Sequence, residues 1–441
     1  MTRLNRLIFT FCMVLLVGWQ TDVASQPHQS SWQLAQRKWQ PVPPRREDRG
    51  AIKVVWLQGT PYEKGYQHGK FLRNEIASLG PEVMQALRFA GRGLGLGRLA
   101  MQRSFPEVVE ECRGLADATK DIGFTMDSCM MVAFGDVYQE LFLYSLPSML
   151  FYSGCSSFVV SGNATRDGRL YHGFTFDQNK KPIDYWVEHP TVFVRQPKDG
   201  IPHVYVAMPG AVWGDNGMNV EGIAVSIDAA HLQSIDGISL QGGSNVQVMA
   251  RVLNQACNFD QAKTLMGTWQ RMRGNIITIS DGKSRQAGVF ELTGREMAVR
   301  RLDEQGTLYA TNHYVAPEMT GQGSTPGQSS LLRYKRYTQL LEPQGAYSLY
   351  GTIDPGVMVK KILRDRTNPD TLQKSPLSVF DDDASIGGNG SLRQGVYDPE
   401  KLLFWVAGGK VPVPENPFVC FSLGAMLGLP NAASCESPAI E

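Results

Sequence analysis

The spacing of hydrophobic residues changes from helical to strand-like partway along the chain. From about residue 81 to residue 145, apolar residues recur every three or four positions, which is typical of amphipathic helices. After residue 155, short runs rich in Val, Ile, Phe and Tyr alternate with turn residues, which predicts strands. The first two runs flank Asp167-Gly168 and form a predicted hairpin. Predicted strands cover 155–161, 169–176, 191–196, 202–208, 219–227, 275–281, 286–292, 297–302 and 307–312.

Helical spacing also precedes, interrupts and follows this strand-rich region. A predicted strand at 51–59 leads into a predicted helix at 62–76, and further helices are predicted at 245–256, 259–269, 329–341 and 354–365. Because groups of helices alternate with groups of strands, the pattern favours sheets covered by helical layers over a barrel.

The N-terminus has the pattern of a secretory signal peptide. Two arginines precede an apolar run at residues 7–19, and the small residues Val23 and Ser25 indicate cleavage before Gln26. We therefore expect residues 1–25 to be a signal peptide and the protein to be exported, either secreted or periplasmic. A short membrane anchor is the alternative, although the run is shorter than the ~18–20 residues that a membrane span needs. Residues 26–50 are rich in Gln, Pro and charge and predict a disordered leader.

Composition is that of an ordinary globular protein and excludes few classes. The 441 residues are 42% hydrophobic, which suffices for the core of one large or two ordinary domains. Lys and Arg total 43 against 42 for Asp and Glu, so the net charge is +1. We do not expect nucleic acid as a partner, because no basic stripe interleaved with aromatic residues occurs.

Cysteine and histidine usage gives no sign of a metal site. Of the 7 cysteines, Cys12 falls in the predicted signal peptide, and the rest show no CxxC spacing. One or two disulfides are compatible with so few cysteines, and Cys420 with Cys435 is the nearest late pair. The 7 histidines show no HxH or HExxH spacing, and no nucleotide-binding glycine motif follows a predicted strand, so neither a metal nor a cofactor is expected.

Cys155 stands at the beginning of a predicted strand, between Gly154 and two serines. Papain-type enzymes activate their thiol at a helix N-terminus with a His partner, so this placement does not suit them. If the Cys155 thiol attacked the Gly154 carbonyl and the peptide bond broke, Cys155 would become a new N-terminus. Its α-amine (pKa ~7.7–8.0) would then match the thiol (~8.5) for proton exchange. Gly154 has no Cβ and tolerates the strained backbone of such an attack.

Five segments, at 59–69, 154–177, 217–226, 274–294 and 310–314, together resemble a known family. They are similar to the motifs of the acyl-coenzyme A:6-aminopenicillanate (isopenicillin N) acyltransferase-like family of N-terminal-nucleophile cysteine hydrolases. The resemblance runs from about residue 54 to residue 409. It implies an α+β fold, a four-layer αββα sandwich with an N-terminal helical segment. It also implies a precursor whose fragments, 26–154 (helical from residue 51) and 155–441 (catalytic), stay associated after cleavage.

The resemblance further implies roles for four residues. Cys155 matches the nucleophile of both self-cleavage and catalysis, and Asp177 matches the aspartate that holds the new α-amine. Asn275 matches an oxyanion donor, and Arg333 matches an arginine that orients Asp177 or the substrate, with Arg336 as the alternative at this helix start. From the residues alone, Cys155 could equally be a buried structural thiol, Asn275 a turn residue and Arg333 a solvated helix residue.

One departure from the family concerns the position three residues before Asp177. Many relatives have arginine there, whereas this chain has Phe174. Either His172 or Arg333 then supplies the positive field near the thiol, or the site prefers an apolar acyl group. Asn219 is a further candidate for the pocket, with an Asx-turn as the structural alternative.

The expected function is therefore that of an exported, self-cleaving amide hydrolase or acyltransferase. The resemblance implies linear amides, such as small N-acyl compounds or lipid amides, as substrates. Two alternatives stay open: a non-catalytic exported binding relative of the same fold, and a thiol protease with a Cys155–His313 dyad.

Overall fold

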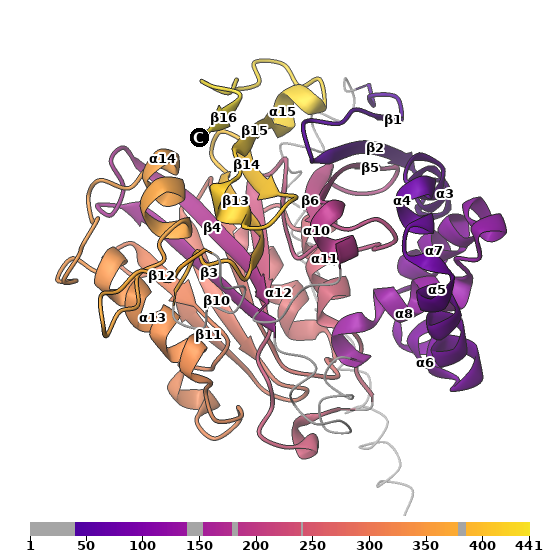
Figure 1. Ribbon diagram of the computed structural model, residues 1–441, viewed down its shortest axis with the longest axis horizontal. Coiled ribbons are helices and arrows are strands. Elements are labelled where there is room, and N and C mark those ends of the chain that lie inside the picture. The colour runs from indigo at the N-terminus through magenta and orange to yellow at the C-terminus, as the bar shows by residue number, and fades with distance from the viewer. Residues whose placement is uncertain (1–39, 139–152, 179–183, 240, 378–384) are drawn as a thin grey trace, which may run out of the picture. The chain divides into compact units, whose positions relative to one another are not determined.

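The computed structural model describes residues 40–138, 153–178, 184–239, 241–377 and 385–441. Within these ranges the strands form two sheets, of nine and seven strands (Figure 1). The predicted signal peptide and most of the predicted leader lie outside the described residues. None of the helices in the described ranges has both the length and the apolar character of a membrane span.

The nine-stranded sheet is antiparallel except where β2 pairs with β5. In spatial order it contains β1 (Arg45–Arg46), β2 (Lys53–Gly59), β5 (Thr191–Pro197), β6 (His203–Ala207), β7 (Asn216–Asn219), β8 (Ile223–Asp228), β9 (Asn275–Asp281), β10 (Gln286–Leu292) and β11 (Met297–Arg301).

The seven-stranded sheet is antiparallel between all neighbours. It contains β12 (Thr307–Ala310), β3 (Ser153–Gly162), β4 (Gly168–Gln178), β13 (Ser391–Asp398), β14 (Leu403–Gly408), β15 (Phe418–Ser422) and β16 (Ala439–Ile440). The predicted hairpin is β3–β4, and its turn uses Gly168 at a φ of +73°, a conformation that glycine adopts without strain.

The helices of the described residues lie in two stretches of the chain, one before β9 and one after β12. The first comprises α3 (Pro61–Phe71), α4 (Arg73–Ala77), α5 (Gly80–Arg88), η1 (Phe89–Gly93), α6 (Leu96–Arg103), α7 (Pro106–Ala118), η2 (Lys120–Ile122), α8 (Met126–Ala133), α10 (Asp184–Glu188), η4 (Ile235–Gly237), α11 (Asn245–Gln255) and α12 (Phe259–Thr268). The second comprises η5 (Pro317–Met319), α13 (Gln328–Leu341), α14 (Pro355–Val357), η6 (Met358–Leu363), η7 (Val413–Glu415) and α15 (Leu423–Met426).

Successive side chains of a strand point to opposite faces of its sheet. One face of each sheet packs on a helical layer, and the other face packs on the other sheet. In the nine-stranded sheet, Phe193 and Tyr205 pack with α3, α7 and α11, whereas Val194 and Val204 pack against the seven-stranded sheet. Phe158 of the seven-stranded sheet faces α13 instead. The order is therefore helices, sheet, sheet, helices, which confirms the predicted αββα fold. Figure 1 shows helices α3 to α8 grouped beside the nine-stranded sheet.

Residues 40–50 differ from the predicted disordered leader. Arg45 and Arg46 form β1 against β2, and the Arg46 guanidinium donates to Glu75 and to the Phe71 carbonyl. Val42 exchanges two hydrogen bonds with the Gln196 side chain. The prediction of disorder is wrong for this part, because its charges have partners that are distant in sequence.

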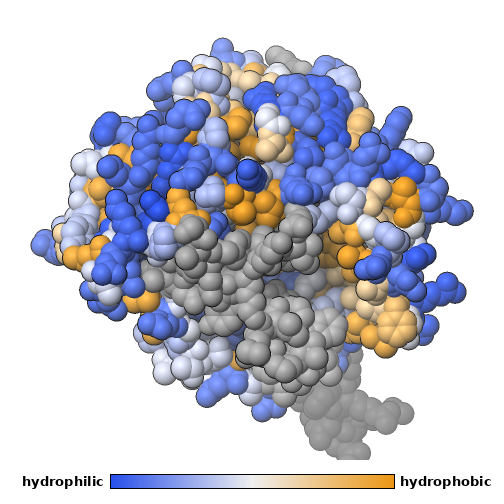
Figure 2. Space-filling model, viewed as in Figure 1, coloured by the Kyte–Doolittle hydropathy of each residue, from blue (hydrophilic) through white to orange (hydrophobic). Residues whose placement is uncertain are grey.

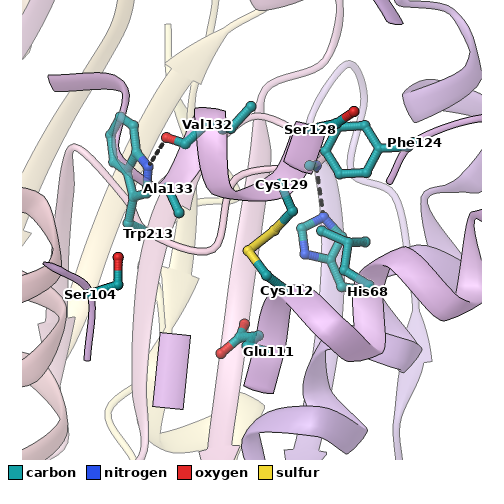
Figure 3. The surroundings of a disulfide bond; sticks show 12 residues. His68, Ser104, Glu111, Cys112, Phe124, Ser128, Cys129, Val132, Ala133 and Trp213 are labelled. Atoms are coloured by element: carbon teal, nitrogen blue, oxygen red, sulfur yellow. Dashed lines mark hydrogen bonds between the residues drawn. A yellow bond between two sulfur atoms is a disulfide. The ribbon is translucent and has the colours of Figure 1, made fainter. Parts of the chain in front are cut away.

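Two disulfides join neighbouring elements among the described residues. Cys112–Cys129 ties α7 to α8, with His68 and Glu111 nearby (Figure 3). Cys420–Cys435 ties β15 to the segment before β16 and is the pair that the sequence singled out. Cys155 and Cys257 are not part of these two disulfides.

The described surface mixes both kinds of side chain. On the face in Figure 2, groups of hydrophobic residues lie between hydrophilic ones, as is usual for protein surfaces.

Candidate active site

Cys155 lies on β3 with its side chain directed between the two sheets. It pairs with Phe176 of β4 and is 3% exposed. Alternation along β3 places it on the same face as Ser157, whose hydroxyl donates to Asp228 across the sandwich at 2.6 Å. The thiol therefore faces the end of β8, where the backbone N–H of Ala229 acts to lower its pKa.

Electrostatics keep this thiol protonated in the intact chain. Burial raises the pKa of Cys155 well above its usual value, and the carboxylates of Asp228 and Asp177 raise it further. The Ala229 N–H and the Arg333 guanidinium act in the opposite direction but more weakly. A further positive charge at this point would therefore favour the thiolate.

Asn312 and Arg333 hold the backbone of Cys155. The Cys155 N–H donates to Asn312 Oδ1 at 3.1 Å, and Arg333 Nη2 donates to the same oxygen at 2.6 Å. Arg333 Nη1 also donates to the Cys155 carbonyl at 2.6 Å. Strand pairing explains the placement: Ala310 of β12 pairs with Ser157, so the chain two residues later runs beside Cys155.

Asp177 lies across from the proposed cleavage site. It pairs with Gly154, and its Oδ1 accepts hydrogen bonds from Thr175 (2.6 Å) and Ser391 (2.7 Å). A Cβ added at Gly154 would lie 3.4 Å from both Arg333 Nη2 and Asp177 Cβ. The structure thus brings Cys155, Asp177 and Arg333 together at the Gly154–Cys155 bond.

Asn275 approaches the same region from β9. The next residue, Ile276, pairs with Asp228, so Asn275 lies level with the residues that follow β8. Its Oδ1 accepts from Asn245 at 2.8 Å, which is its one side-chain hydrogen bond to described residues. The Nδ2 group, which an oxyanion would need as a donor, is left available.

Asp228 is a site residue that the sequence did not single out. It is fully buried, and its Oδ2 accepts from Ser157 while Oδ1 has no hydrogen-bond partner among described residues. Burial raises its pKa to about 8, and the Asp177 charge acts in the same direction. The only sequence signal is a carboxylate ending an apolar strand. Asn312 was likewise missed, although it lies in one of the motifs.

The two histidines considered for the site lie elsewhere. His313 Nδ1 bonds to Ser330 at 2.7 Å, and its hydrogen bonds to described residues do not include Cys155. Burial lowers its pKa to about 4. His172 pairs with Val159, four residues along β3 from Cys155, and bridges Ser226 and Ser280 between the sheets with its pKa lowered by burial to about 3. Arg333, not His172, supplies the positive charge near the thiol.

Of the remaining candidate residues, Phe174 lies on the face of the sheet that carries the thiol, whereas Asn219 and Arg336 make structural contacts elsewhere. Phe174 is buried and, by alternation on β4, faces the same side as Phe176 and Cys155. Asn219 makes four hydrogen bonds: it donates to the carbonyls of Leu253 and Ala256, and it accepts from the N–H groups of Glu221 and Ile223. It holds α11 to the β7–β8 turn, so Asn219 has a structural role and not the role in the pocket that the sequence also allowed. Arg336 bonds to Asp365 and Gln339, away from Cys155.

Comparison with known proteins finds one family model that matches part of the chain. Residues 185–375 match the family described as acyl-coenzyme A:6-aminopenicillanic acid acyl-transferase, which confirms the resemblance expected from the motifs. An uncharacterized protein from Archaeoglobus fulgidus is 27% identical over an alignment of 343 positions, which covers 68% of this chain and 56% of that protein. The chain thus spans little more than half the length of this relative.

Two solved structures are also similar at low levels. A Caenorhabditis elegans N-acylethanolamine-hydrolyzing acid amidase ortholog has 14% identity and a TM-score of 0.38, over 56% of this chain and 93% of its own. A mutant conjugated bile acid hydrolase from Clostridium perfringens has 12% identity and a TM-score of 0.31, over 58% and 89%. Similarity at this level supports no inference about function.

Proposed function

From the match of residues 185–375 to the acyl-transferase family, we propose that the protein is an exported, self-cleaving amide hydrolase or acyltransferase. The Gly154–Cys155 bond is the cleavage site, and Cys155 is the nucleophile of both cleavage and turnover. The substrates are small N-acyl compounds with linear amide bonds, lipid amides included. After cleavage, the α-amine of Cys155 is the base.

One observation carries the proposal: the nitrogen that would become the α-amine already has a side-chain acceptor. Asn312 Oδ1 binds this N–H, and the Asp177 carboxylate lies across from Gly154. Both groups stabilise positive charge, so they suit an α-ammonium formed at this point. That ammonium would lower the raised pKa of the adjacent thiol.

The proposed self-cleavage begins when the Cys155 sulfur adds to the Gly154 carbonyl carbon. The C–N bond then breaks, the nitrogen takes up the proton that the thiol has lost, and the acyl group stays on sulfur as a thioester. Water hydrolyses the thioester, which leaves a Gly154 carboxylate and a free N-terminal Cys155.

Turnover repeats this chemistry on the substrate. The thiol transfers its proton to the α-amine and attacks the amide carbonyl, while Asn275 Nδ2 and the Ala229 N–H donate to the oxyanion. The α-ammonium protonates the leaving amine, and water or an acceptor amine resolves the thioester. Phe176, which pairs with Cys155, and Phe174, two residues away on β4, lie on the same face of the sheet as the thiol, which favours an apolar acyl group.

Expression of the full-length chain in a secreting host tests the proposal. We expect mass spectrometry to find two N-termini, Gln26 and Cys155, together with hydrolysis of N-acyl amides. Cys155→Ala should leave one uncleaved chain without turnover. Cys257→Ala is the matched control, since Cys257 is the other described cysteine outside the two disulfides.

Three results would contradict this function. An uncleaved wild-type chain that still hydrolyses amides would exclude the α-amine as base. An uncleaved, inactive wild-type chain would support the non-catalytic binding relative. Loss of turnover in His313→Ala with normal cleavage would support the histidine dyad.

A further inference from the structure

A second cavity lies on the opposite face of the nine-stranded sheet from Cys155. Its volume is about 270 Å³, at the small end of the range for ligand pockets, and α3, α7, α11, β5 and β6 contribute to its lining. Arg195, His203 and Tyr205 enter it from the sheet face that packs on helices. Asp228, in contrast, lies on the face of the nine-stranded sheet that packs against the seven-stranded sheet. The sheet therefore separates this cavity from the candidate active site.

Most charged groups of the cavity neutralise one another. Arg195 binds Glu111 through both oxygens, at 2.6 and 2.5 Å, and also donates to the Tyr205 hydroxyl. Arg251 pairs with Glu107 at 2.8 Å. Burial and the Arg195 charge hold the pKa of His203 well below its usual value, so this ring is neutral. Two opposite charges, Lys198 and Asp199, are exposed.

Lys64 is the buried charged residue of the cavity that forms no ion pair with a described residue. Its side chain lines the cavity, the residue is only 6% exposed, and its ammonium has no hydrogen bond or ion pair with any described residue. Burial lowers its pKa to about 8. Glu111 and Glu107 attract this ammonium only from beyond ion-pair distance, and they already pair with Arg195 and Arg251. A buried ammonium without an ion pair of its own is destabilising, so the site favours an anion that can supply one.

The surroundings of Lys64 restrict what this anion can be. One unmatched positive charge suits a monoanion, because a dianion such as phosphate would leave the cavity with an excess negative charge. Pro61, Val108, Val212 and Ala250 add apolar lining, which suits a short hydrocarbon chain.

We propose that this cavity binds a small organic monocarboxylate, whose carboxylate pairs with the Lys64 ammonium. The site is separate from the proposed catalytic function and does not depend on it. The carboxylate enters between α3 and α11, and its chain lies against the apolar lining.

Chemical labelling of Lys64 tests the proposal in the wild-type protein. Cyanate carbamylates uncharged lysine amines, and peptide mass spectrometry gives the rate at each lysine. Butyrate at about ten times its dissociation constant should slow labelling of Lys64 roughly tenfold, because only the free site reacts. Butyramide, the neutral analogue, and inorganic phosphate should not protect it. Lys198 at the cavity rim should label equally in all conditions.

Several labelling results would overturn the proposal. Equal rates at Lys64 in butyrate and butyramide would show that the charge is not recognised. Equal protection by phosphate would show an unselective anion site. An unreactive Lys64 would show that the ammonium cannot be reached from solvent. Since the readout is local to Lys64, butyrate bound as a product at Cys155 does not affect it.

A pair of variants provides an independent measurement. Lys64→Met removes the ammonium and keeps an unbranched side chain, whereas Lys198→Met makes the same change at the rim. By calorimetric titration, Lys64→Met should bind one butyrate fewer per chain than the wild type, and Lys198→Met should bind the same number. Equal stoichiometry in all three proteins would refute the proposal. If Lys64→Met does not fold, the labelling experiment decides.

Discussion

Asn312 connects two groups at the proposed cleavage site through one oxygen atom. Oδ1 accepts from both the Cys155 N–H and Arg333, while Nδ2 donates to the Ala229 carbonyl at 2.8 Å. These bonds fix the amide and hold β3, α13 and the end of β8 in one arrangement. Removing the side chain leaves polar groups without partners in a buried place, which is costly.

We therefore expect Asn312→Ala to slow self-cleavage and to lower the free energy of unfolding by about 1–3 kcal/mol. Fragment formation over time, followed by gel electrophoresis, and urea denaturation measure the two effects. His313→Ala is the neighbouring control for cleavage. Cleavage of Asn312→Ala at the wild-type rate would show that this side chain does not position the bond.

Asp228 should make stability depend on pH. Its folded-state pKa, about 8, lies above the usual value near 4, so the folded protein holds this proton more tightly than the unfolded chain does. Its contribution is therefore most favourable below pH ~4 and is lost progressively up to pH ~8, by roughly 1.4 kcal/mol per pH unit.

Relative to Asp228→Asn, the wild type should accordingly lose stability between about pH 4 and pH 8. Denaturant unfolding of both proteins across this range measures the difference, and Asp236→Asn, at an exposed carboxylate, is the control. A constant difference between wild type and Asp228→Asn would mean that the Asp228 pKa is not raised.

The elements around the second cavity depend on a close helix crossing. In α3 and α7, Gly65 and Gly114 allow the two backbones to touch: an added Cβ would lie 1.9 Å from the Glu111 carbonyl oxygen and 2.0 Å from that of Tyr62, respectively. Backbone cannot move aside as a side-chain tip can. The distance between these helices, and with it the position of Lys64, is therefore set by two glycines.

Gly65→Ala and Gly114→Ala should each lower the free energy of unfolding by about 1–3 kcal/mol or more, because the helices must separate. Thermal or urea unfolding measures this. Gly135→Ala is the matched control, since a Cβ there meets nothing within 4 Å. Unchanged stability in both crossing variants would show that the helices separate freely.

At the scale of the whole molecule, the proposed cut would not release either fragment. The first fragment contributes β1 and β2 to the nine-stranded sheet, where β2 pairs with β5 of the second fragment over residues 53–59. Helices α3 to α8 share a core with β5, β6 and α11. Both disulfides lie within one fragment each, Cys112–Cys129 in the first and Cys420–Cys435 in the second.

The cleaved protein should thus elute as one species in native size-exclusion chromatography and separate into two bands on a non-reducing SDS gel. Burial of a shared apolar core holds the fragments together, and no disulfide seen in the structure crosses the cut. Separation under native conditions would contradict the shared core, and a single non-reduced band from cleaved protein would contradict the disulfide pairing.

The sequence alone was sufficient where the signal is local. Strands such as β5 and β9 and helices such as α11 show their periodicity within one segment. The motif around Cys155 indicated the nucleophile candidate, and the five motifs together implied the fold. The same reasoning did not single out β13, which is buried throughout yet carries Arg393, Gln394 and Asp398. Its polar side chains reach partners that are distant in sequence, as Arg393 reaches Asp215, and no local pattern reveals these contacts.

Only the tertiary structure decided which side chains meet. Asn312 reaches Cys155 because β12 pairs beside β3, and Asp228 reaches Ser157, two residues farther along β3, because β8 faces β3 across the sandwich. Residue spacing determines on which face of a strand a side chain lies, but the pairing of strands far apart in sequence determines what that face contacts. For the same reason, Lys64 could be recognised as an unmatched buried charge only after the helices and the sheet had been placed around it.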